Sequence, residues 1–173
     1  DNKETYDTLF LTGLRIGELC ALRWCDLDLE HKKLSVRGSF STASRKVTSP
    51  KTKTSIRTID LPNRLVGELK QRYERKKKLD GFNDLYYVFG DIAVTWPGTF
   101  RYRFNNDLKN VDVKHITIHG FRHSHASYLL SNPMISESLV AERLGHSIDM
   151  LRSTYAHIYE KRRTALVEYI EKL

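Results

Sequence analysis

The chain has 173 residues, enough for one substantial domain whose core needs no covalent cross-link to be stable. Its 29 Lys and Arg residues against 21 Asp and Glu give a formal net charge of +8, which fits a nucleic-acid partner and general solubility about equally well. The sequence has no apolar run near the roughly 20 residues that a membrane-spanning helix needs and no signal-peptide pattern, which argues against a membrane protein. Cys20 and Cys25 have the spacing of neither a redox motif nor a zinc site, and we interpret them as reduced thiols of a cytosolic protein.

The first residues predict two helices separated by a glycine break. Residues 3–11 have helical periodicity, Gly13 interrupts it, and a second helix starts at Arg15. A cation at a helix N-terminus opposes the helix dipole unless an anion shares that site. Taken alone, Arg15 is more simply interpreted as a surface arginine paired with Glu18.

The middle of the chain changes from helical to alternating periodicity. Apolar and polar residues alternate at both ends of residues 34–61, which predicts half-buried antiparallel strands. The Ser-, Thr- and Lys-rich tract at residues 41–55 predicts a strand-and-turn excursion between them. Residues 64–79 then predict an amphipathic helix closed by the basic run 75–78.

The second half predicts a succession of helices with recognisable ends. Trp96-Pro97-Gly98 indicates a turn, and Thr99 the N-cap of the next helix. The remaining helical segments are expected at residues 117–130, from Ser136 to a C-cap at Gly145, from Ser147 to Ile158, and at residues 164–173. The fold class expected is therefore mainly α with a small antiparallel β-sheet (α+β).

Four polar residues with phosphate chemistry lie within a short stretch: His119, Arg122, His146 and Tyr155. Without a metal ion, phosphoryl transfer needs cations around the non-bridging oxygens and a proton donor for the leaving oxygen. Arginine and histidine can supply these functions, and a tyrosine can supply the nucleophile. Periodicity alone assigns Tyr155 to the core.

A metal site is the competing interpretation of the histidines. His115, His119 and His123 are spaced four apart, which on one helix would form a ligand face. However, residues 116–118 have an extended pattern, and no carboxylate lies between Lys114 and Met134. A two-metal nuclease would also need convergent acidic residues, which the sequence does not suggest. We therefore expect neither a metal nor a cofactor.

Four motifs occur in order along the chain: Gly13-Leu14-Arg15-Ile16-Gly17-Glu18-Leu19, His119-Gly120-Phe121-Arg122-His123, Leu144-Gly145-His146-Ser147 and Thr154-Tyr155-Ala156-His157. Together they resemble the conserved boxes of the tyrosine recombinases, the phage integrase family. The resemblance runs from about residue 5 to residue 160, and the four boxes together are far more specific than His-x-x-Arg alone.

The resemblance implies DNA strand cleavage and rejoining without a cofactor, through a 3′-phosphotyrosine on Tyr155. It implies that Arg15 and Arg122 bind the non-bridging oxygens, to which a guanidinium can donate two hydrogen bonds at once. It also implies that His119 and His146 bond the phosphate and assist proton transfer.

A lysine completes the set that the resemblance implies. Pro50-Lys51-Thr52 resembles the family's position for the lysine that protonates the leaving oxygen, so Lys51 is the expected general acid. Lys53, two residues away, is its competitor. Asn132-Pro133 departs from the glycine turn of many relatives, which changes a loop and no catalytic residue.

The function expected is a site-specific DNA recombinase or integrase of a phage or mobile element, acting in the bacterial cytosol or nucleoid, or in the host cytosol for a phage. The alternatives are a type IB topoisomerase and a non-enzymatic basic DNA-binding module. The partners implied are double-stranded DNA, further copies of the chain in a tetrameric synapse, and accessory DNA-bending or excision factors. We expect residues 1–173 to form one catalytic domain, residues 164–173 to dock on a neighbouring protomer, and upstream DNA-binding domains to be missing.

Overall fold

The structure is a computed structural model that describes residues 2–49, 55–113 and 116–172. Its α-helices are α1 (Asn2–Thr12), α2 (Ile16–Ala21), α3 (Asn63–Lys76), α4 (Pro97–Leu108), α5 (Gly120–Ser131), α6 (Glu137–Leu144), α7 (Ile148–Thr154) and α8 (Ala156–Ile170), with a short 3-10 helix η1 (Trp24–Asp26). Its strands are β1 (Leu27–Asp28), β2 (Lys33–Val36), β3 (Ser39–Ser41), β4 (Lys46–Thr48) and β5 (Arg57–Asp60).

The strands form two small antiparallel sheets. One has the order β1-β2-β5, with Leu34 opposite Ile59, and the other pairs β3 with β4. Alternation on β5 buries Arg57 and Ile59 and exposes Thr58 and Asp60, as expected of a half-buried strand. The fold is therefore mainly helical with small antiparallel sheets, as the sequence predicts.

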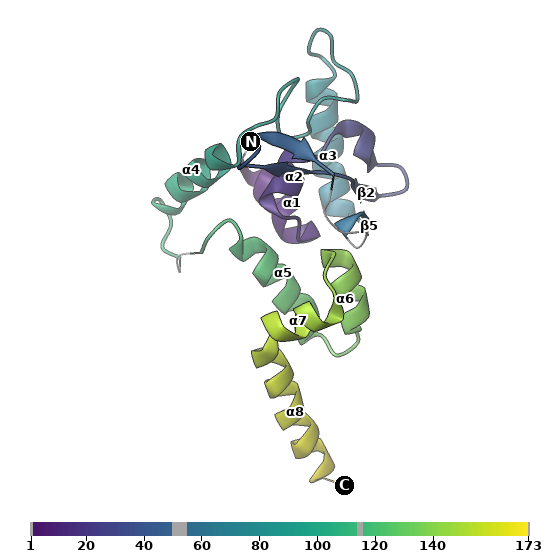
Figure 1. Ribbon diagram of the computed structural model, residues 1–173, viewed down its shortest axis with the longest axis vertical. Helices are drawn as coiled ribbons and strands as arrows, with labels where there is room; N and C mark the ends of the chain where they lie inside the picture. The colour runs from purple at the N-terminus through teal and green to yellow at the C-terminus, as the bar shows by residue number, and fades with distance from the viewer. Residues whose placement is uncertain (1, 50–54, 114–115, 173) are drawn as a thin grey trace.

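The molecule has two parts, which Figure 1 shows one above the other. We call α1 to α4 with both sheets the N-terminal body, and α6 to α8 the C-terminal arm. Helix α5 connects them, because it packs against α1 at one side and against α6 and α8 at the other. Helix α8 begins beside α5 and α7 and then extends away from the rest of the molecule to the C-terminus (Figure 1).

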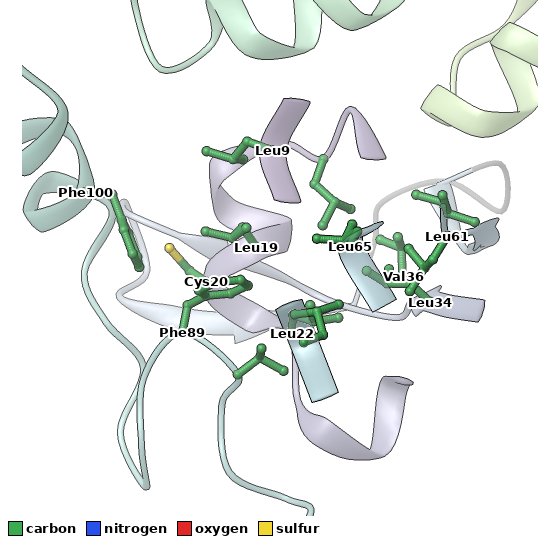
Figure 2. Packing of buried hydrophobic residues seen from close by; sticks show 14 of the residues in the cluster. Leu9, Leu19, Cys20, Leu22, Leu34, Val36, Leu61, Leu65, Phe89 and Phe100 are labelled. Carbon is green, nitrogen blue, oxygen red and sulfur yellow. The ribbon is translucent and has the colours of Figure 1, made fainter. Parts of the chain in front are cut away.

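Each part has its own apolar core. Figure 2 shows the core of the N-terminal body, where leucines from helices and strands meet Phe89 and Phe100. The smaller core, which α5 shares with the C-terminal arm, is built around Leu130 of α5 and Leu144 and Leu151 of the arm, all fully buried. Burying such side chains stabilises each part by about 2 kcal/mol per residue. Both cysteines are free: Cys20 is buried in the first core and Cys25 is exposed.

Three predicted boundaries are wrong. Helix α4 begins at Pro97 rather than after Thr99, because proline suits the first helical position, where no N–H is required. Helix α5 begins at Gly120, since residues 116 and 117 belong to neither a helix nor a strand and residues 118 and 119 form a turn. The helix expected from Ser147 to Ile158 breaks at Tyr155, so the terminal helix starts eight residues earlier than predicted.

Candidate active site

The chain reverses direction just before Arg15. Gly13 has φ +68°, a left-handed conformation that suits glycine, and a β-carbon there would lie 2.7 Å from the His125 ring. Arg15 then caps α2 and bonds Glu18 twice: its main-chain N–H donates to Oε2 and its Nη1 to Oε1, both at 2.9 Å. The predicted Arg15–Glu18 pair is thus present, and the Arg15 side chain is still 36% exposed.

Glu18 is held from its other side by a second arginine. Arg57 donates from Nη1 and Nη2 to the two carboxylate oxygens at 3.1 and 2.9 Å, and both side chains are almost fully buried. Burial by itself raises the pKa of Glu18, but the hydrogen bonds and charge of Arg57 outweigh it, so the pKa of Glu18 is lowered. Arg57 is not among the site residues predicted from the sequence. Its signal was a charged residue at an inward-facing position of a predicted strand.

Arg122 joins the two parts of the molecule. It lies in the first turn of α5, is only 2% exposed, and donates to the main-chain oxygens of Gly13 and Leu144, each at 2.6 Å. Burial and the charge of Arg15 lower its pKa to about 10, so it remains a cation at neutral pH. The arginine is therefore fixed between the start of α2 and the end of α6.

His146 lies directly beside Arg122. Gly145, with φ +65°, ends α6 in the predicted left-handed C-cap and turns the next residue back toward α5. Nη2 of Arg122 donates to His146 Nε2 at 2.8 Å, which places the imidazole proton on Nδ1. That Nδ1 is buried and has no hydrogen-bond partner in the described part of the chain. Burial, then the charges of Arg122 and Arg15, lower the pKa of His146 to about 4, so it is neutral at pH 7.

Tyr155 lies at the break between α7 and α8, with its side chain buried against the core of the C-terminal arm. Its hydroxyl lies 3.3 Å from Nδ1 of His123, and the two rings are 5.7 Å apart. Burial raises the pKa of Tyr155, although the charge of Arg122 opposes the shift. Arg122 therefore lies close enough to the tyrosine for the two groups to influence each other's ionisation.

His119 and His123 stand one turn apart on the same side of α5, with ring centroids 4.7 Å apart in an edge-to-face arrangement. Burial and the nearby charges of His123, Arg122 and Arg15 lower the pKa of His119. The sequence analysis did not assign His123 to the phosphate site. Its helical spacing from His119 was the available signal.

The structure thus brings Arg122 and His146 into direct contact, and the charge of Arg15 acts on the pKa values of both. The charge of Arg122 also acts on the pKa values of His119 and Tyr155. Lys51 and its competitor Lys53 lie outside the described residues, as does His115. Within the described ranges, no group of three or more His, Cys, Asp or Glu side chains is placed to hold a metal ion. Over the same ranges, no helix has the length and apolar character needed to cross a membrane.

Comparison with known proteins identifies related sequences over nearly the whole chain. The model of the phage integrase family matches residues 2–162. The ICEBs1 integrase of Bacillus subtilis (strain 168) is 31% identical over 182 residues, which cover 99% of this chain and 49% of that protein. The integrase of Staphylococcus phage L54a is 30% identical, covering 94% of this chain and 49% of its own length. The chain therefore spans about half the length of these curated relatives.

Solved structures share the fold. The Tn1549 transposon integrase in complex with circular intermediate DNA superposes with a TM-score of 0.71 at 24% identity, over 96% of this chain and 59% of that one. The XerA recombinase superposes with a TM-score of 0.69 at 23% identity, over 94% of this chain and 59% of that one. These likenesses confirm the predicted fold class.

Proposed function

We propose that this chain, which belongs to the phage integrase family, is the catalytic domain of a site-specific DNA recombinase that integrates or excises a phage or mobile element. The two relatives described above are named as integrases, one of them of a phage, which favours this role over relaxation of supercoils by a type IB topoisomerase. On this proposal, residues 1–173 act as one catalytic unit of a longer protein.

The observation that carries the proposal is the position of Arg122. Its guanidinium is fixed by two carbonyls and touches His146. The charge of Arg15 acts on the pKa of Arg122, and the charge of Arg122 acts on the pKa of Tyr155. Buried, preorganised cations next to a hydroxyl nucleophile are what phosphoryl transfer without a metal requires. The alternative of a merely DNA-binding module gives no reason to bury a charged arginine beside a neutral histidine.

The reaction that we propose is an in-line displacement at phosphorus. Arg15 and Arg122 bind the non-bridging oxygens, and His119 and His146 hydrogen-bond the phosphate and assist proton transfer. The oxygen of Tyr155 bonds to phosphorus while the bond to the 5′ oxygen breaks, which leaves a 3′-phosphotyrosine and a 5′-hydroxyl. Lys51 gives the proton to that leaving oxygen, with Lys53 as the competitor.

The proposed partners follow from charge and from the exposed end of the chain. A net charge of +8 suits double-stranded DNA, and relatives of this fold have been solved in complex with DNA.

Helix α8 exposes Leu166, Val167 and Ile170, each more than half accessible. We propose that residues 164–173 dock on a neighbouring protomer within a tetramer on DNA, in the bacterial cytosol or nucleoid, or in the host cytosol for a phage. Accessory DNA-bending or excision factors would complete that assembly.

Covalent capture tests the proposal. The protein is incubated with a pool of duplexes of randomised sequence that carry a 5′-bridging phosphorothiolate, whose sulfur leaves without a proton and cannot readily rejoin. We expect denaturation-resistant protein–DNA adducts enriched for one sequence. Absence of any adduct from the pool, for this chain and for the longer protein, would contradict the proposal. Relaxation of plasmids lacking the enriched sequence would favour the topoisomerase instead.

A further inference from the structure

The hydrogen bond between His123 and Tyr155 has no role in the chemistry assigned above. Tyr155 is 2% exposed, and its hydroxyl faces Nδ1 of His123 at 3.3 Å. A neutral phenol can donate this bond to an imidazole that carries its own proton on Nε2 and offers a free electron pair on Nδ1. The arrangement is that of a hydroxyl nucleophile and its base.

A tyrosine needs such a base because the neutral phenol is a weak nucleophile. Burial makes ionisation of Tyr155 harder still, so its proton must leave as the oxygen attacks. His146 does not serve as this base, since its Nε2 already accepts a hydrogen bond from Arg122. In the part of the chain that the structure describes, the hydrogen bond recorded for the Tyr155 hydroxyl is the one to His123.

The surroundings suit an imidazole that gains a proton during the reaction. The titratable rings that lie against His123 are those of His119 and Tyr155, and Arg122 directly precedes it in α5. His119 is kept neutral by burial, so a protonated His123 meets no second imidazolium. Its charge would instead lie near the anionic phosphate.

The backbone brings His123 and Tyr155 together from two different parts of the chain. His123 stands one turn beyond His119 on α5, the helix that also fixes Arg122. Tyr155 reaches it because the chain leaves helical geometry there, with φ −115° and ψ 29°, between α7 and α8. A continuous helix through Tyr155 would direct the ring differently.

We propose that His123 is the general base that activates Tyr155. As the phenolic oxygen bonds to phosphorus, the hydroxyl proton passes to Nδ1 of His123, the bond to the 5′ oxygen breaks, and Lys51 protonates that oxygen. In the reverse, rejoining step, His123 returns its proton to the departing phenolate. This role rests on the proposed recombinase function.

The test measures adduct formation on the captured phosphorothiolate duplex, where proton supply to the leaving group no longer matters. His123→Gln keeps a hydrogen-bond acceptor but cannot take the proton, so we expect its cleavage rate to fall about 100-fold. The acid limb of the wild-type pH–rate profile should disappear with it. In His123→Ala, added imidazole should restore part of the rate. His31→Gln, which changes an exposed histidine between β1 and β2, is the matched control and should cleave like the wild type.

The outcomes separate this inference from the function on which it rests. If the wild type forms adducts and His123→Gln forms them at the same rate with the same pH profile, His123 is not the base. The proposal would also be overturned if His123→Gln were slow but kept the acid limb of the wild-type pH–rate profile, and imidazole did not restore the rate of His123→Ala. His123 would then have only a packing role. If the wild type itself forms no adduct, the recombinase function fails and the role of His123 fails with it.

Discussion

The N-terminal body and the C-terminal arm are each held by an apolar core, but arginine side chains hold the two together. We call the interface that these arginines form the seam. Arg122 bonds the carbonyl oxygens of Gly13 and Leu144, Arg57 bonds that of Arg143, and Arg143 bonds those of Leu11 and Asp60. Apolar contacts are non-directional, whereas a guanidinium fork fixes both distance and angle. The difference explains how two separately packed parts can hold catalytic groups in register.

The position of the proposed site follows from this contrast. Arg15 belongs to the N-terminal body, whereas His146 and Tyr155 belong to the C-terminal arm, and Arg122 lies between them on α5. The proposed active site is thus part of the seam itself. Changes that weaken the seam should affect both stability and catalysis, while changes at the far end of the arm should affect neither within one protomer.

The largest effect is expected from Arg122→Gln, which removes the central link of the seam. It leaves the carbonyls of Gly13 and Leu144 buried without their donor, each costing about 1–3 kcal/mol, so we expect the free energy of unfolding to fall by about 4 kcal/mol. Urea unfolding followed by tryptophan fluorescence measures this loss. Arg103→Gln, at an exposed position of α4, is the control and should change stability by less than about 0.5 kcal/mol. Equal stabilities of the two variants would show that the apolar cores alone hold the parts together.

The next effect concerns pH. Burial and the charge of Arg143 lower the pKa of His125 to about 4, while its unfolded value is about 6.5. Because the unfolded chain binds more protons between these values, stability falls as the pH falls through this window, by about 3 kcal/mol between pH 7 and pH 4. His146 contributes with the same sign. Urea unfolding across this range should show that His125→Gln has a flatter dependence than the wild type, and an unchanged slope would contradict the assignment.

A smaller effect is expected at Gly13, where the N-terminal body lies against α5 and α6. Gly13→Ala would place a β-carbon 2.7 Å from His125 and 2.8 Å from Leu144, in a left-handed conformation that disfavours alanine. We expect a loss of about 2 kcal/mol, measured by thermal or urea unfolding. Gly67→Ala is matched to it, because that helical glycine has nothing within 4 Å of the added carbon, and should stabilise α3 by about 0.5–1 kcal/mol. The seam would be looser than described if both variants behaved alike.

The smallest effect on stability is expected at the end of the arm. Leu166 and Ile170 are 58% and 55% exposed, so Leu166→Ser with Ile170→Ser should change the free energy of unfolding by less than about 0.5 kcal/mol. The same double variant should lose multi-protomer complexes on the captured duplex, measured by sedimentation, if residues 164–173 dock on a neighbour as we propose. A destabilised variant that still assembles would mean that α8 packs on its own chain.

The sequence predicted local features better than the seam. Ser136, Gly145 and the apolar stripe between them determine α6 by local chemistry, and the structure confirms that helix and its left-handed end. The turn predicted at Pro97 is instead the start of α4, because proline suits both a turn and the first position of a helix. The break at Tyr155 has no local signal, since its neighbours continue a helical pattern.

The contacts that build the site depend on tertiary packing. Periodicity cannot reveal that Arg57 reaches Glu18, 39 residues away, or that Tyr155 reaches His123, 32 residues away. Side-chain chemistry singled out four candidates, namely His119, Arg122, His146 and Tyr155, and resemblance to a family added Arg15. The structure was needed to show that Arg122 contacts His146. The partners that fix those residues are the part that sequence reasoning missed.

Mapping the covalent bond on the captured adduct tests the central claim most directly. The adduct is digested with protease and nuclease, and mass spectrometry locates the nucleotide that remains on the protein. The seam site predicts a 3′-linked nucleotide on Tyr155, and predicts that Tyr155→Phe binds the same duplex but yields no adduct. A nucleotide on any other residue, or an adduct that persists in Tyr155→Phe, would contradict the account.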